Sequence, residues 1–173
     1  MFFFPDNTVL INFALAREVG LLLELLRGQG QWTDAVHAEC EKSADTGLYP
    51  ALEDVFSAMP SPIMLSQKEV QDARALRQQM SGPADPEHKN WGEAQTITVI
   101  DQRFSGSCFL TDDFGATDSA NGAGIQVFST AQLFALAVNV GKVERDTARA
   151  TLQWLVDEHR RGIRIEQFDA GVR

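Results

Sequence analysis

Five carboxylates are the residues whose types and positions suggest chemistry in this chain: Asp6, Glu39, Glu93, Asp112 and Asp113. Each is expected at the edge of a folded element or on a helix. Several carboxylates cannot share a small cleft while all are ionised unless something positive neutralises them. Mg²⁺ and Mn²⁺ prefer oxygen ligands and are usually bound by a few carboxylates together with substrate phosphate. The pattern therefore predicts a divalent-metal site suited to phosphodiester hydrolysis.

Each of these acids also has a simpler structural interpretation. Asp6 precedes a predicted helix and is suited to cap its free backbone amides. Glu39 lies on an amphipathic helix, where most glutamates are solvated. Glu93 follows Gly92 in a first helical turn, where the helix dipole favours a carboxylate. One member of the pair Asp112-Asp113 could cap the next helix, but two adjacent acids rarely both do so. It is the combination that indicates a metal site.

Other chemistries have little support in the sequence. Cys40 and Cys108 lack the spacing of metal ligands and are expected to be reduced core residues. His88 and His159 have no neighbouring cysteine or histidine with which to form a zinc site. A serine or cysteine nucleophile with a histidine base is likewise not indicated by any motif.

The elements that must position the acids alternate between short apolar strands and helices. This alternation predicts an α/β fold with a parallel sheet in three layers, whose active site gathers at the carboxyl ends of the strands. Asp6 and Asp112-Asp113 are expected at those ends. The predicted strands cover residues 2–5, 63–65, 108–111 and 125–129, and the predicted helices cover 8–19, 21–26, 34–44, 49–59, 66–80, 91–100, 114–121, 130–139 and 144–161.

The 173 residues, 44% of them hydrophobic, are enough for one sizeable core. Residues 81–86 form a predicted loop between a helical first half and a more alternating second half. Neither half is large enough to suggest self-sufficiency, so we expect a single domain over residues 1–173.

The net charge of −9 argues against broad nonspecific binding of nucleic acid, which needs a large basic surface, although a local groove stays compatible with it. The opening residues 1–4 are apolar, but they lack a basic leader and Asp6 interrupts them. We therefore expect neither a signal peptide nor a membrane span, and a cytoplasmic location.

Four segments carry a family resemblance: 6–12 (DNTVLIN), 92–94 (GEA), 110–113 (LTDD) and the closing run from 124 to 165. In this order, across nearly the whole chain, they resemble the PIN-domain family of nucleases. The resemblance implies an α/β/α sandwich with a central parallel sheet and a metal-dependent ribonuclease acting on single-stranded RNA. It also implies, for many members, the role of toxin in a bacterial toxin–antitoxin pair.

Transferred to this sequence, the resemblance makes Asp6 the first acid, Glu39 the second and Glu93 the third. Asp113 is favoured over Asp112 as the fourth. These acids would hold one or two Mg²⁺ or Mn²⁺ ions, with Glu39 as a ligand or as the residue that orients a metal-bound water.

Two features depart from the family pattern. Asn7 stands where the family commonly has a small hydroxyl residue, and the hydroxyl is displaced to Thr8. The helical region 51–80 is longer than compact toxin-type members need. The extra length suggests an added cover or a surface for a partner, either an antitoxin protein or a second copy of the chain.

Candidate substrate contacts lie near the acids. Thr8 and Thr111 neighbour them in sequence, and Arg103, before the strand that leads to Asp112, could contact phosphate, as could Lys89. Trp91 could stack on a base. Arg103 and Lys89 also fit ordinary surface charges, and Trp91 also fits the core.

Two rival functions remain open at this point. The same fold and acids are compatible with a module that binds nucleic acid or protein without cleaving it. They are equally compatible with a metal-dependent phosphatase or DNA nuclease, because carboxylates select phosphate chemistry and not the nucleoside.

Overall fold

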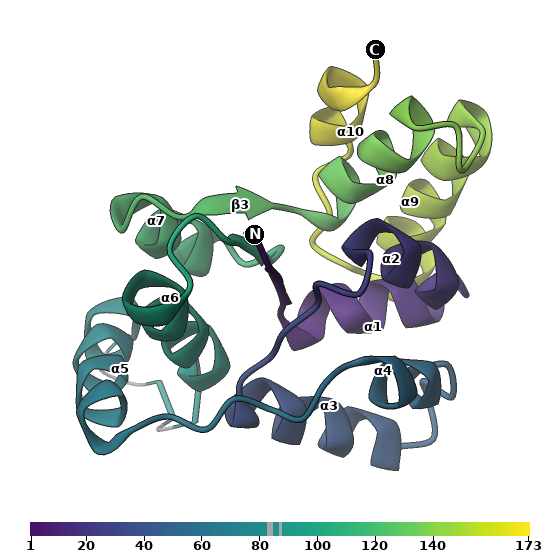
Figure 1. Ribbon diagram of the computed structural model, residues 1–173. Helices are drawn as coiled ribbons and strands as arrows, with labels where there is room; N and C mark the ends of the chain where they lie inside the picture. Colours follow the sequence, from purple (N-terminus) through teal and green to yellow (C-terminus); the bar gives the residue numbers. More distant parts are fainter. Residues whose placement is uncertain (83–84, 87) are drawn as a thin grey trace.

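The computed structural model describes residues 1–82, 85–86 and 88–173. It has a mixed α/β fold that is mostly helical and contains a three-stranded parallel sheet (Figure 1). The strands are β1 (Phe3–Pro5), β2 (Cys108–Leu110) and β3 (Gln126–Phe128), in the order β1-β2-β3. Phe109 is the central residue, since it pairs with Phe4 on one side and Val127 on the other. The predicted α/β class with parallel strands is confirmed.

Two single-residue bridges continue the parallel pairing beyond β1. Gly30 pairs with Phe3, and Thr33 pairs with Ile63. The predicted strand at 63–65 is therefore wrong beyond Ile63. The chain leaves the sheet at Met64, whose carbonyl accepts a hydrogen bond from the Arg103 guanidinium (3.0 Å) and not from a neighbouring strand.

Ten helices are present in the described ranges. They are α1 (Asn7–Leu15), α2 (Val19–Leu26), α3 (Asp34–Asp45), α4 (Leu52–Ala58), α5 (Gln67–Met80), α6 (Trp91–Arg103), α7 (Phe114–Gly122), α8 (Thr130–Asn139), α9 (Arg145–His159) and α10 (Ile165–Gly171).

Most predicted helices are confirmed, with two differences. The helix predicted over 8–19 ends at Leu15, because Arg17 adopts a left-handed conformation (φ 59°) that interrupts it. Helix α10 was not predicted; it has seven residues and a single buried side chain, Phe168. So short a segment gives almost no helical periodicity.

Side-chain caps explain why several helices begin where the sequence predicts. The hydroxyl of Ser66 accepts from the Glu69 N–H while the Glu69 carboxylate accepts from the Ser66 N–H, and this capping box starts α5. Ser129 and Gln132 start α8 in the same way. Capping thus fixes the orientation of the chain immediately after β3.

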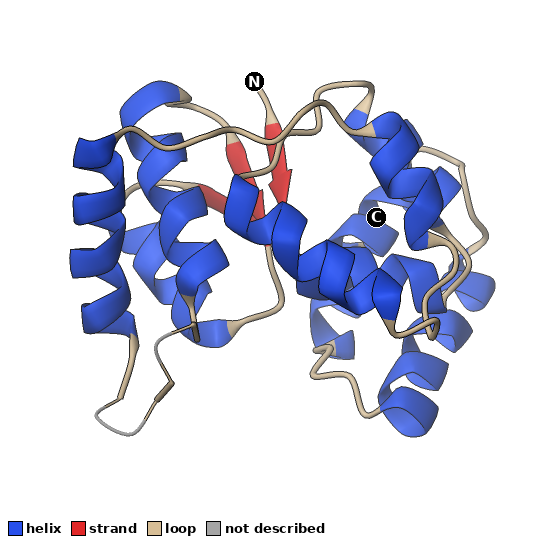
Figure 2. Ribbon diagram, turned by 90° about the horizontal axis from the view of Figure 1, so that it is seen from below, coloured by secondary structure: helices blue, strands red, loops and turns tan. Residues whose placement is uncertain are grey.

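The sheet separates two hydrophobic clusters. Cys108 and Leu110 face a large cluster formed with α1, α2, α3, α4, α8, α9 and α10. Phe109 points to the opposite face, where it packs with Phe4 and with Ile97 of α6. This alternation follows from the two-residue period of a strand. Figure 2 shows the short strands lying between two groups of helices.

Three smaller predictions concern single features. Cys40 and Cys108 are buried free thiols, as expected. The predicted loop at 81–86 includes Pro83 and Ala84, which lie outside the described residues. Within the described ranges, no helix combines the length and the apolar character needed to cross a membrane.

Candidate functional site

The carboxyl ends of β1 and β2 lie side by side and bring three of the predicted acids to one edge of the sheet. Asp6 follows β1 directly, and its N–H donates to the carbonyl of Leu110 in β2 (2.9 Å). Asp112 and Asp113 come shortly after Leu110. The expectation that these acids gather at this edge agrees with the observed geometry.

Asp6 is buried and held in a fixed orientation. Its Oδ1 accepts from the Val9 N–H (2.8 Å), which makes it the N-cap of α1, and its Oδ2 accepts from the hydroxyl of Thr111. Burial raises the pKa of Asp6 well above its usual value, opposed by these two hydrogen bonds, and the negative charges of Asp112 and Glu93 raise it further. Asp6 is therefore both the N-cap of α1 and a member of a group of neighbouring acids.

Asp112 is held by donors on three sides. The Thr130 N–H donates to its Oδ1 (2.9 Å), and its Oδ2 accepts from the Thr130 hydroxyl and from the amide of Asn12 (2.8 Å). Burial raises the pKa of Asp112, while these donors and the positive charge of Arg161 oppose the rise. Asp112 is therefore a half-buried carboxylate whose charge acts on Asp6.

Asp113 has a different position. It is exposed, and its Oδ1 caps α7 by accepting from the Ala116 N–H (2.7 Å). Its charge raises the pKa of Glu93, after the larger effect of burial. The charge of Asp112 acts on Asp6 and that of Asp113 acts on Glu93, so the preference for Asp113 over Asp112 stays a prediction.

Glu39 and Glu93 meet at the first turn of α6. The Glu39 carboxylate accepts from the Gly92 N–H, and a Cβ built on Gly92 would lie only 3.0 Å from its Oε1. A glycine at position 92 therefore allows the carboxylate of α3 to approach α6. Burial, followed by the charge of Glu93, raises the pKa of Glu39 to about 7.

The five acids thus form one electrostatically connected group. Charge effects connect Asp6 with Asp112 and Glu93, Glu93 with Glu39, and Glu93 with Asp113. Carboxylate oxygens of this kind are the ligands that a hard divalent cation prefers. No three of them lie close enough to hold one ion, and the same is true of every His, Cys, Asp and Glu in the part of the chain that the structure describes. Like-charge repulsion favours such spacing between facing carboxylates.

The structure corrects two of the predicted substrate contacts. Thr111 is fully buried, and its hydroxyl donates to Asp6 and accepts from the Asp113 N–H (3.1 Å), so it positions the acids. Arg103 lies at the opposite end of α6 from Glu93. Its guanidinium donates to both carboxylate oxygens of the buried Glu69, and it is therefore a structural residue. Thr8 is half-buried in the first turn of α1, close to the acids.

Three residues of this site were missed by the sequence analysis: Asn12, Thr130 and Arg161. Asn12 is buried, donates to Asp112 and to Thr130 Oγ1 (3.1 Å), and accepts from Arg161 Nε (2.6 Å). A single asparagine among the buried apolar residues of α1 was the available signal, because a polar side chain there needs partners. Arg161 carries no comparable signal, since it lies beyond α9.

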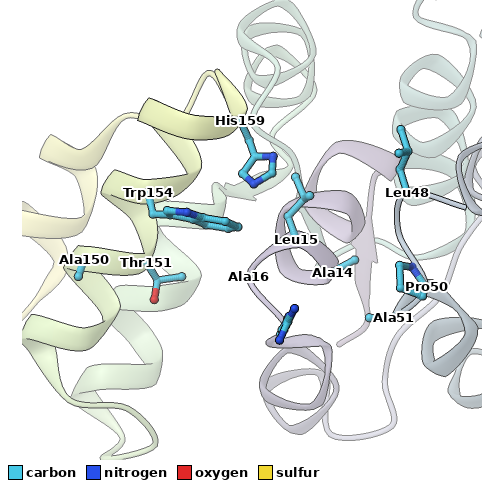
Figure 3. Close-up of a pocket in the computed structure, with 11 residues that line it drawn as sticks. Ala14, Leu15, Ala16, Leu48, Pro50, Ala51, Ala150, Thr151, Trp154 and His159 are labelled. Atoms are coloured by element: carbon cyan, nitrogen blue, oxygen red, sulfur yellow. The ribbon is translucent and has the colours of Figure 1, made fainter.

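A separate cavity of about 760 Å³ lies between the end of α1, the segment before α4, and α9. Figure 3 shows Trp154 and His159 on one side of it and Leu48 and Pro50 on the other. Leu48 is 69% exposed and Trp154 is 43% exposed. None of the described residues lining it is acidic, so it is a second surface with a different chemistry.

Comparison with known proteins adds no relative to this description. No family model matches the chain, and no curated protein or solved structure is significantly similar to it.

Proposed function

We propose that the chain is a metal-dependent endoribonuclease that hydrolyses single-stranded RNA. The observation that supports this most directly is the convergence of Asp6 and Asp112 at the ends of adjacent parallel strands, with Glu93 and Glu39 on facing helices. An α/β/α sandwich of the PIN type belongs to the same proposal. It is supported by helices on both faces of the sheet and by bridges that extend the parallel pairing.

Asp6 and Asp112, the pair at the strand ends, would hold Mg²⁺ or Mn²⁺, with waters and substrate phosphate supplying the other ligands, because no three of the described acids lie close enough to share one ion. The bound ion would supply Lewis-acid chemistry, lowering the pKa of a water and neutralising charge on the phosphate. Thr111 orients Asp6, while Asn12 and Thr130 orient Asp112. Each carboxylate keeps free lone pairs, because an ionised carboxylate offers about four acceptor sites.

Glu39 is suited to accept a proton from the attacking water. Its pKa of about 7 lies near neutral pH, where a general base works best. From α3, Glu39 would take this proton beside Glu93 at the first turn of α6. Asp113 would contribute negative charge at the exposed rim.

The resemblance extends the proposal to a toxin of a toxin–antitoxin pair, working in the cytoplasm, with an antitoxin or a second copy of the chain as its protein partner. A second candidate function is binding of a protein partner without cleavage. The exposed apolar side chains of Leu48 and Trp154, beside the cavity of Figure 3, favour it.

The test is cleavage of a panel of single-stranded RNA and DNA with Mn²⁺, Mg²⁺ or a chelator. RNA should be cut only with metal, whereas cleavage of DNA alone would support the rival nuclease. Asp6→Asn and Asp112→Asn should each reduce cleavage by about 100-fold or more while the fold stays intact.

The matched control is Asp118→Asn, an exposed carboxylate in α7, which should cleave like the wild type. A wild-type protein that binds RNA but never cuts it with Mn²⁺, where a control nuclease works, would contradict the nuclease proposal and favour a module that binds nucleic acid without cleaving it.

A further inference from the structure

A cavity of about 570 Å³ lies between the second half of α5 and the start of α6. Its described lining residues are Arg74, Arg77 and Gln78 of α5, Trp91 of α6, and His88 just before it. None of them is acidic. In a chain with a net charge of −9, this is a local concentration of cationic and aromatic groups.

The two arginines differ in how they are held. Arg77 donates from Nε to the Lys89 carbonyl (3.0 Å) and from one terminal nitrogen to the Pro86 carbonyl (2.9 Å). These bonds fix the guanidinium and leave its other N–H groups free to donate. Arg74 is exposed, and neither arginine forms an ion pair within 4.0 Å among the described residues. Arg77 also acts by its charge on Asp85, so Arg74 and the unused N–H groups of Arg77 are the groups that can donate to an anion.

Trp91 is half-buried and anchored through one edge. With the Gln95 amide oriented so that its nitrogen donates to Asp34 Oδ1 (2.7 Å), the Gln95 oxygen accepts from the indole Nε1 of Trp91 (3.3 Å). A ring held at its edge is a stable platform for stacking. Aromatic faces accept any base, since every base has a π-face.

The cavity adjoins the acidic group through the first turn of α6. Trp91 precedes Gly92 and Glu93, and Gly92 contacts Glu39. The pKa of Lys89 is raised chiefly by its bond with Asp85, and the charge of Asp113 also contributes. The segment before α6 therefore lies within electrostatic reach of the acids, and a short strand could cross this turn from the cavity to Glu93.

We propose that this cavity binds single-stranded nucleic acid, with Arg74 and Arg77 on backbone phosphates and Trp91 stacked on an unpaired base. The inference rests on the proposed function, since the cavity would bind the part of the RNA substrate that leads to the acidic group. Guanidinium groups suit phosphate oxygens, and stacking requires an unpaired base. Duplexes should bind poorly.

The experiment measures binding of a short fluorescein-labelled oligouridine by fluorescence anisotropy, in chelator and at several salt concentrations. Trp91→Ala should weaken binding by about 10-fold, and Trp91→Phe should retain most of it. Arg74→Gln and Arg77→Gln should each lower the slope of log affinity against log salt by about 0.7. A blunt RNA duplex should compete poorly, and a deoxy oligomer tests whether the sugar matters.

The matched control is Arg145→Gln, an exposed arginine in α9 at the other end of the molecule (Figure 1). It changes the net charge equally and should leave affinity and slope unchanged. In cleavage assays with Mn²⁺, the cavity variants should raise KM more than they lower kcat.

The outcomes separate the two proposals. If variants of Arg74 and Trp91 bind and cleave RNA like the wild type, the proposal that this cavity binds nucleic acid is wrong, while the proposed nuclease function is unaffected. Binding that depends on these residues, without any cleavage, would support the cavity and count against the nuclease. If Arg145→Gln weakens binding as much as Arg74→Gln does, the effect comes from net charge alone and the proposed binding at this cavity is wrong. Absence of RNA binding by the wild type would also contradict it.

Discussion

Glu39 lies in an environment that opposes its charge. Its folded pKa of about 7 exceeds the ordinary value of 4.5, because the side chain is buried against α6 and faces Glu93. The unfolded chain releases this proton first as pH rises. The folded state therefore loses stability between about pH 4.5 and pH 7, and the loss is complete above that range.

Glu39→Gln should remove this loss. In chelator at pH 8, we expect the variant to exceed the wild type in free energy of unfolding by about 2 kcal/mol, with the difference fading toward pH 4.5. Urea denaturation at several pH values measures it. Glu53→Gln, at an exposed position in α4, is the control, and an equal pH dependence of both differences would contradict the assignment to Glu39.

Arg103 and Glu69 form the main ionic contact between α5 and α6. Hydrogen bonds from Arg103 lower the pKa of Glu69 to about 2. The stability that this pair contributes is present above about pH 4.5 and is lost as pH falls toward 2. Glu69 is also the third residue of α5 and completes its capping box, so the same carboxylate starts one helix and anchors the end of another.

Arg103→Ala should therefore lower the free energy of unfolding by about 1–2 kcal/mol at pH 7, because the Glu69 carboxylate loses its partner while the 37% exposure of Arg103 lets solvent screen the pair. KM for RNA should not change. Lys68→Ala, which removes the exposed pair with Asp72, should have a much smaller effect on stability. Chemical denaturation and steady-state kinetics test both, and a raised KM at unchanged stability would restore Arg103 as a substrate contact.

The close approach of α3 to α6 depends on Gly92. Gly92→Ala would place a methyl group about 3.0 Å from the Glu39 carboxylate, which a flexible side chain relieves by moving away. We expect stability in chelator to change by less than about 1 kcal/mol, while the rise in Tm on adding Mn²⁺ becomes smaller.

Gly20→Ala is the matched control, because this exposed helical glycine has no neighbour within 4 Å. It should stabilise the protein by about 0.5–1 kcal/mol and leave the Mn²⁺ effect unchanged. If Gly92→Ala retains the full Mn²⁺ effect, Glu39 is not part of the metal site.

Elements whose boundaries are marked by capping residues and hydrophobic periodicity in the sequence were predicted well, and elements without such local features were not. The helix that begins after Ser66 has a capping box and a polar face, and its bounds were predicted closely. The segment at Ile63 was over-extended, because nothing in an apolar tripeptide reveals that Arg103, forty residues later, binds the Met64 carbonyl. Similarly, the hydrogen bonds that Asn12 and Thr130 donate to Asp112 could not be predicted, because both residues lie far away in sequence.

At the scale of the whole molecule, the small sheet is the structure that both hydrophobic clusters share. Cys108 and Leu110 contribute to the cluster with α1 and α8, and Phe109 to the cluster with α6 and α7. Three consecutive residues thus connect two cores that lie on opposite faces. The single domain expected over residues 1–173 depends on this connection.

Phe109→Ala should destabilise the whole chain and not only one side. We expect a loss of about 3–5 kcal/mol, because Phe109 is fully buried at the centre of the sheet. In a variant whose only tryptophan is Trp32, fluorescence reports the opposite cluster, while far-UV circular dichroism reports all helices. If the chain unfolds as one cooperative unit, both probes should give the same urea midpoint, and Phe109→Ala should lower both equally. An unchanged fluorescence transition beside a weakened circular dichroism transition would instead divide the chain into two independently folding parts.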